Sequence, residues 1–151
     1  MATLQLSEAQ ARKIYPAASE ELRTILEDTF TKDFFNQKIT DRLKTVLDAY
    51  AVTGTPYIIP EGLTPDEVAY RHLKVVVKAL NEGWTPNWDN DEEAKYYPWF
   101  CLDAPSGFCL DAVYWSYTIS DVGFRLRFRS RELAEYAARQ FHDLYKQFFT
   151  A

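Results

Sequence analysis

The chain lacks most of the motifs that carry enzymatic chemistry. It has only two histidines and two cysteines, and it contains no P-loop, no Gly-x-Gly-x-x-Gly run and no spaced set of metal ligands. No arrangement of Ser, His and Asp resembles a hydrolytic triad. These absences weigh against an enzyme without deciding the point, because an active site can be built from scattered residues. We expect neither a cofactor nor a metal.

Long apolar runs are also absent. No stretch approaches the roughly 18 residues that a transmembrane helix needs, and the N-terminus has no basic and apolar segments of the secretory kind. A hairpin turn centred on Pro105 would place Cys101 opposite Cys109, so a disulfide is geometrically conceivable. Because cytosolic disulfides are rare, we expect a cytosolic protein with reduced thiols and no membrane association.

Positive charge is scarce as well. The net charge is −5 and the pI about 5.1, whereas proteins that coat duplex DNA usually have a basic face and a basic pI. Duplex DNA is therefore not an expected partner. Aromatic residues, by contrast, are abundant at 16% of 151 residues. This length suits a single domain over residues 1–151, and the surplus of rings predicts a pocket or an interface in addition to the core.

Capping signals and apolar periodicity predict five helices. Ser7 and Ser19 open the first two, and Thr64-Pro65-Asp66-Glu67 is the strongest helix start in the chain. Breakers at Pro16 and Gly83 end the first and fourth helices. The expected helical ranges are 7–15, 20–30, 41–51, 64–81 and 131–149.

Three β-segments are predicted between the last two helices, at 97–102, 108–117 and 122–129, with turn residues between them. This order, in which helices come first and are followed by strands and a final helix, is typical of an α+β fold. We therefore predict N-terminal helices, a three-stranded antiparallel meander and a C-terminal helix packed on the sheet.

Four arginines cluster in and after the third predicted strand. Arg125, Arg127 and Arg129 alternate with apolar residues, so a strand would place their guanidinium groups on one face, with Arg131 following at the helix start. Such a ladder could bind phosphate through bidentate hydrogen bonds. The alternative is a solvated sheet face whose arginines pair with carboxylates, of which Asp111, Asp121 and Glu132 are the candidates.

Aromatic rings crowd the first two predicted strands. Tyr97, Trp99, Tyr114 and Trp115 are the candidates for flanking a planar base, since stacked rings contribute roughly 1–3 kcal/mol per base. Alternation places rings on both faces of the sheet, so one face would be left for a ligand or a second copy of the chain. The alternative is that rings such as Trp99 and Phe100 fill the core.

Two further groups carry weaker signals. Residues 84–93 are acidic but lack the residue order of a calcium-binding loop, which favours a solvated loop over a metal site. His72 and His142 belong to no metal set and are expected on helix surfaces or at their boundaries.

Several segments together resemble a family of small proteins encoded by phages and prophages of Bacteroides-type gut bacteria. The resemblance spans nearly the whole chain and rests on four segments: Leu26–Phe30, Ala79–Trp84, Lys95–Phe100 and Arg125–Ala137. It implies a phage or mobile-element origin and action in the cytoplasm of the bacterial host. The family has no established activity, so the resemblance supplies no catalytic residues.

The leading hypothesis is a non-enzymatic binding protein, expected to self-associate, that captures an anionic nucleotide-like ligand and so counters host defence signalling. The four arginines would hold phosphate, and the four rings would flank the base. A second hypothesis is an accessory single-stranded nucleic-acid binder in phage replication. A third is a protein–protein inhibitor or a structural phage component. A phosphodiester-cleaving enzyme would need hidden acid–base residues such as His72 or His142.

Overall fold

The computed structural model describes residues 5–103, 105 and 107–151. Within these residues it contains eight α-helices, one 3₁₀ turn and one two-stranded antiparallel sheet. The elements in chain order are α1 (Glu8–Ile14), the 3₁₀ turn (Tyr15–Ala17), α2 (Glu20–Phe30), α3 (Lys32–Asn36), α4 (Ile39–Arg42), α5 (Val46–Thr53), α6 (Pro65–Leu80), β1 (Lys95–Cys101), β2 (Cys109–Ser116), α7 (Arg131–Gln140) and α8 (His142–Thr150).

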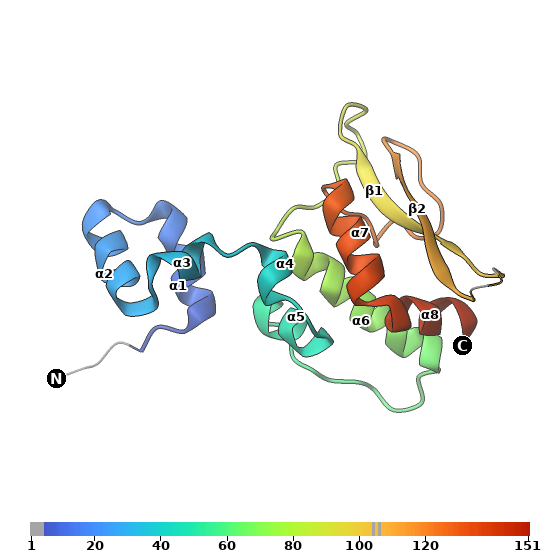
Figure 1. Cartoon of the computed structure of the whole chain (residues 1–151), viewed down its shortest axis with the longest axis horizontal. Coiled ribbons are helices and arrows are strands. Elements are labelled where there is room, and N and C mark those ends of the chain that lie inside the picture. Colours follow the sequence, from blue (N-terminus) through green and yellow to red (C-terminus); the bar gives the residue numbers. More distant parts are fainter. Residues whose placement is uncertain (1–4, 104, 106) are drawn as a thin grey trace.

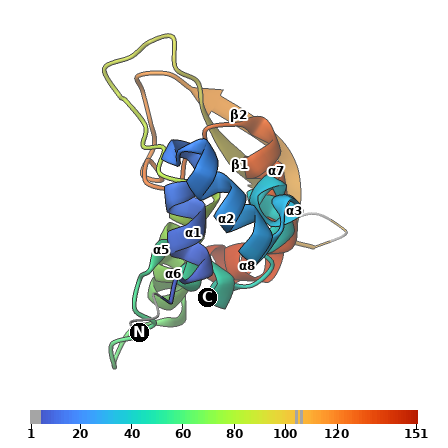
Figure 2. The ribbon, with the colours of Figure 1, turned by 90° about the vertical axis from the view of Figure 1, so that its left-hand side faces the viewer.

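Helices α1 to α3 form a small N-terminal unit to one side of the remaining elements (Figure 1). The hydroxyls of Ser7 and Ser19 cap α1 and α2, as predicted. The unit is held together by rings, with Tyr15 stacked on Phe35 at 4.0 Å between centroids and Phe30 on Phe34 at 5.2 Å. Figure 2 shows the three helices from this side of the molecule, in front of the others.

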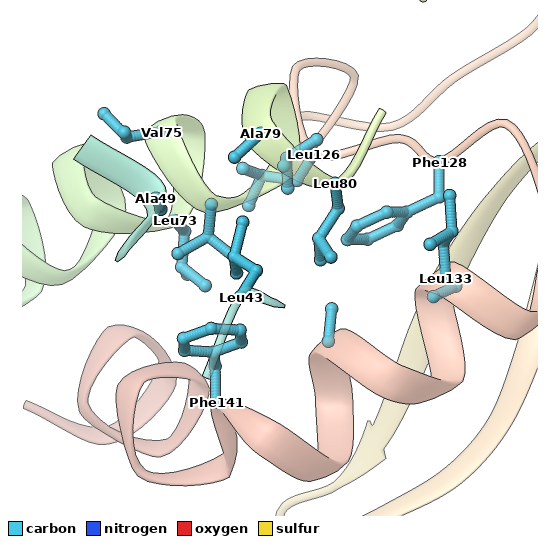
Figure 3. Packing of buried hydrophobic residues seen from close by; sticks show 14 of the residues in the cluster. Leu43, Ala49, Leu73, Val75, Ala79, Leu80, Leu126, Phe128, Leu133 and Phe141 are labelled. Atoms are coloured by element: carbon cyan, nitrogen blue, oxygen red, sulfur yellow. The ribbon is translucent and has the colours of Figure 1, made fainter. Parts of the chain in front are cut away.

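The main hydrophobic core lies outside the N-terminal unit, among residues from Ile39 to Tyr145. Helix α6 lies at its centre because apolar residues at helical spacing bury one face, including Leu73, Val76 and Leu80. Helix α6 packs on α5 and α8, and α7 packs on the hairpin. Figure 3 shows Leu80 beside Phe128, whose ring is fully buried.

The predicted hairpin is confirmed for its first two strands. Strand β1 pairs with β2 in antiparallel register, with Tyr97 opposite Tyr114 and Cys101 opposite Cys109. Both cysteines are thiols. The register shifts between Trp99 and Phe100, which marks a β-bulge.

The third predicted strand is wrong, and with it the three-stranded meander. Residues 122–129 meet β1 through a single bridge in which Tyr96 and Phe128 exchange two backbone hydrogen bonds of 2.9 and 2.8 Å. The next antiparallel pair would join Pro98 to Leu126, but Pro98 has no N–H to donate. The amide of Leu126 donates instead to the carbonyl oxygen of Gly123 at 2.9 Å, which closes a turn.

The buried side chain of Asn81 binds the edge of this segment that faces away from β1. Its Nδ2 donates to the carbonyl oxygen of Arg127 at 2.8 Å, and its Oδ1 accepts from the amide of Arg129 at 3.1 Å. Because Phe128 directs its own backbone groups to Tyr96, those of its two neighbours point the other way, and one side-chain amide satisfies both of them.

Two predicted helices are each split in two. The helix predicted over 41–51 is interrupted at Leu43, whose φ of −103° and ψ of 87° are not helical, and Thr45 with Asp48 forms a capping box that starts α5. The helix predicted over 131–149 is interrupted at Phe141 (φ −110°, ψ 31°). At this point Nε2 of His142 lies 2.9 Å from the carbonyl oxygen of Phe108 in a hydrogen bond. This is a tertiary contact, so the local sequence does not predict it.

Candidate functional site

A cavity of about 490 Å³ lies beside strand β1, a size typical of small-molecule sites. We call it the β1 cavity. Its walls are mostly apolar and come from β1, from residues 121–127 and from helices α6 and α8. Three of the predicted ligand-binding residues line it: Tyr97, Trp99 and Arg127.

Arg127 is the charged group at the centre of the β1 cavity wall. Its side chain is only 2% exposed, and its guanidinium carbon lies 3.7 Å from the ring centroid of Tyr97. Its Nη2 donates to Asp121 at 2.7 Å and to the hydroxyl of Ser120 at 2.8 Å. Burial lowers the pKa of Arg127, although Asp121 acts in the opposite direction. The charge is thus less well compensated than it would be in water.

Two buried donors of residues in the cavity wall have no hydrogen-bond partner among the residues that the structure describes. One is the Nε–H of Arg127 and the other is the hydroxyl of Tyr145. Tyr145 is almost fully buried, and this burial raises the pKa of its hydroxyl far above the ordinary value. An unpaired buried polar group costs about 1–3 kcal/mol. The wall of the β1 cavity therefore contains two unsatisfied donors, both covered by neighbouring side chains.

The predicted rings divide between the two faces of the hairpin. Tyr97, Trp99 and Tyr114 share the outer face, where the centroids of Trp99 and Tyr114 lie 5.7 Å apart. Trp115 lies on the opposite face, opposite Tyr96 in the register. Trp99 and Trp115 are 49% and 48% exposed, so neither indole is sealed in the core.

The four predicted arginines do not form one ladder, because the strand that would align them is absent. Arg129 pairs with Glu82, and Nη1 of Arg131 donates to the carbonyl oxygen of Val113 at 2.8 Å. Arg125 is exposed, with its guanidinium 4.9 Å from the ring of Phe124. Of the predicted carboxylate partners, Asp121 pairs with Arg127, which is buried and not on a solvated sheet face, whereas Arg129 pairs with Glu82, which was not predicted. Of the four arginines, Arg127 lines the β1 cavity.

Comparisons with known proteins identify no relative. No protein-family model matches the chain, and neither a curated protein nor a solved structure matches it. The resemblance to phage proteins of gut bacteria, and the origin and location that it implies, stay predictions.

The described part of the chain contains no cluster of three or more potential metal ligands among its His, Cys, Asp and Glu side chains. The acidic loop is organised by the buried Lys95, whose Nζ donates to the carbonyl oxygens of Asn90 and Glu93 at 3.1 and 2.7 Å.

Among residues 5–103, 105 and 107–151, no helix has the length and apolar character to cross a bilayer.

The two histidines are expected to affect stability in opposite directions with pH. Burial, aided by the charge of Arg71, lowers the pKa of His72, which lies 3.1 Å from the hydroxyl of Tyr50. As the pH falls, His72 is protonated in the unfolded chain at a higher pH than in the folded protein. Its contribution to the stability of the fold is therefore present above about pH 6.5 and is lost as the pH falls. Hydrogen bonds to Phe108 and Asp143 raise the pKa of His142, so its contribution is lost as the pH rises through the raised value.

Urea denaturation between about pH 5 and pH 8 tests this expectation. The variant His72→Gln should reduce the loss of stability on the acid side, and His142→Gln should reduce the loss on the alkaline side. Each variant serves as the control for the other. Identical pH profiles for both variants and the wild type would contradict the assignment.

Sequence reasoning missed Tyr145 and did not single out Tyr70 or Phe148, which also line the cavity. Tyr145 comes four residues after the buried Phe141, which is the spacing of a helix face that packs on the core, so the sequence did not distinguish it from a core residue. A tyrosine on an otherwise apolar helix face was the only available signal, because a buried hydroxyl needs a partner.

Proposed function

We propose that the protein is a non-enzymatic binding protein that captures a small anionic, nucleotide-like ligand in the β1 cavity. The ring of the ligand would lie among Tyr97, Trp99 and the apolar wall. Its negatively charged or carbonyl oxygen would accept hydrogen bonds from Arg127 and Tyr145. A phage origin, a role against host signalling and action in the bacterial cytoplasm belong to this proposal through the sequence resemblance alone.

The observation that carries the proposal is the pair of unsatisfied donors in one cavity wall, the Arg127 Nε–H and the Tyr145 hydroxyl. Leaving both unpaired costs stability in the empty protein, and a ligand whose acceptor group displaced the side chains that cover these donors would recover that cost. One guanidinium and few polar groups favour a ligand with a single anionic group, such as a nucleoside monophosphate, over a polyphosphate.

Removing the tyrosine hydroxyl gives a test with two opposite readouts. Tyr145→Phe is expected to raise the free energy of unfolding of the empty protein by about 1 kcal/mol, because it deletes an unpaired buried group. The same variant should bind ligand about tenfold more weakly, because it deletes a hydrogen-bond donor. Thermal denaturation measures the first effect, and isothermal titration with each of the four nucleoside 5′-monophosphates measures the second.

The indoles offer a matched pair of variants for the binding measurement. Trp99→Ala should weaken binding, because Trp99 lines the β1 cavity, whereas Trp115→Ala is the control, equally exposed on the other face of the hairpin. Native mass spectrometry of protein purified under non-denaturing conditions would reveal a retained molecule. No retained mass, together with no binding of any monophosphate at millimolar concentration, would refute the proposal.

A second candidate function is a protein–protein module, favoured by the exposed rings beside the cavity mouth. Trp99 and Tyr114 are both about half exposed on the outer face, and Leu102 and Val122 next to the cavity are also exposed. Large exposed rings are typical anchors of interfaces. Self-association through this face would appear as a concentration-dependent mass in sedimentation analysis and would be lost in Trp99→Ala.

A further inference from the structure

A second cavity, of about 830 Å³, lies between the N-terminal unit and the rest of the chain. We call it the junction cavity. Its wall is formed on one side by residues of α1 together with Phe34 and Gln37, and on the other by residues of α4, α5 and Glu82. Three cationic side chains line it: Arg12, Lys13 and Arg42.

Arg12 is held in place on one side of this cavity. Its guanidinium carbon lies 3.6 Å from the ring centroid of Phe34, and its Nη2 donates to the Gln37 side chain at 3.0 Å. Neither partner neutralises its charge. Burial, followed by the nearby charge of Arg42, lowers the pKa of Arg12, while Glu8 and Glu82 act in the opposite direction. The two guanidinium groups thus repel each other across the cavity.

Arg42 is incompletely satisfied on the other side. Its side chain is 20% exposed, and its Nη2 lies at 3.5 Å from the Glu82 carboxylate, a long contact for an ion pair. Its Nε–H is buried and has no partner within residues 5–103, 105 and 107–151. Nη2 is therefore available to an acceptor better placed than Glu82, and the Nε–H becomes available when the Arg42 side chain turns toward the cavity.

The carboxylates of the junction cavity are largely committed elsewhere. Glu82 divides its charge between Arg42 and the closer Arg129. Asp48 accepts from the amides of Lys44 and Thr45 at 3.0 and 2.7 Å and so caps α5. Glu8 lies in the first turn of α1, where the partial positive charge of the helix end favours it. Glu8 and Glu82 still act on Arg12, but burial and the charge of Arg42 outweigh them, so the two guanidinium groups are compensated only in part.

We propose that the junction cavity binds a small oxyanion of the phosphate class, held between Arg12 and Arg42. The oxyanion accepts from the guanidinium of Arg12 and from that of Arg42, whose side chain turns so that its buried Nε–H faces the ion, and it relieves the repulsion between the two. Since Arg12 belongs to α1 and Arg42 to α4, the bound ion also ties the N-terminal unit to the core. The site is independent of the β1 cavity.

The test is a titration of ¹⁵N-labelled protein with inorganic phosphate, at constant ionic strength maintained with sodium chloride. The arginine Nε–H signals report each guanidinium separately, so binding at the junction is distinguished from binding at Arg127. We expect the Arg42 and Arg12 signals to shift saturably. Arg42→Lys keeps the charge but removes the Nε–H and should weaken phosphate binding about tenfold.

Two further variants keep the test decisive. Arg12 lies outside the core cluster, so the Arg12→Lys variant should keep the fold of the wild type. This variant should weaken phosphate binding by a similar factor. Arg139→Gln, which removes an exposed arginine of α7 that does not line the junction cavity, should bind phosphate like the wild type. A linear, unsaturated shift in the wild type, or undiminished binding in both lysine variants, would overturn the proposal.

Discussion

Replacing Phe128 with alanine is expected to lower the free energy of unfolding by about 3–5 kcal/mol. The ring is fully buried, and Figure 3 shows it beside Leu80 and Leu133 in the core. The same residue forms the only bridge, within the described residues, that joins segment 122–129 to β1. The substitution therefore leaves a cavity at the point where this segment is attached to the hairpin.

Urea denaturation followed by circular dichroism measures this loss. Ile119→Ala is the matched control, because Ile119 is an exposed apolar residue in the same connection between β2 and α7, and it should change stability by no more than about 0.5 kcal/mol. A loss below about 1 kcal/mol for Phe128→Ala would mean that the ring is not packed as the structure has it.

The variant Asn81→Asp is expected to be the second most damaging, at about 2–4 kcal/mol near neutral pH. The substitution keeps the shape and the acceptor for the Arg129 amide but replaces the donor to the Arg127 carbonyl with a carboxylate oxygen. Two oxygens would then face each other in a buried site. A protonated carboxyl could still donate, so the folded state should raise the pKa of this group.

The expected pH dependence follows from that direction. A raised pKa in the folded state means that the variant is least impaired below the ordinary aspartate value of about 4 and loses stability as the pH rises. Unfolding measurements of variant and wild type at about pH 4 and pH 7 test this. Asn87→Asp is the control, since exposed Asn87 uses only its oxygen, as acceptor for the Asp89 amide. Equal losses at both pH values would argue against the Asn81 hydrogen bonds.

Helix starts were predictable because their signals are local. Ser7, Ser19, Thr64 and Ser130 each precede a helix that the structure confirms, since a capping residue acts on amides within three or four positions. The third strand was not predictable from its own alternation. Its pairing with β1 ends at Pro98, which is distant in the sequence and acts only once the segments meet.

The candidate site was predictable in the same limited way. Tyr97, Trp99 and Arg127 were chosen for their chemistry, and all three line the β1 cavity. Arg125, Arg129, Arg131 and Trp115 were grouped with them through a strand that does not form. The Tyr145 hydroxyl could not be recognised in advance, because a missing partner is a property of the packed molecule and not of a residue pattern.

Pro98 also limits how copies of this chain could meet. Pro98 lies two residues after Tyr96, on the edge of β1 that does not pair with β2. A strand that added to this edge would need an N–H from residue 98, which proline lacks. Continuation of the sheet into a neighbouring molecule is therefore blocked at the β1 edge. A dimer that covered this side of the hairpin would have to form through side chains such as those of Trp99 and Tyr114 and not through main-chain pairing with β1.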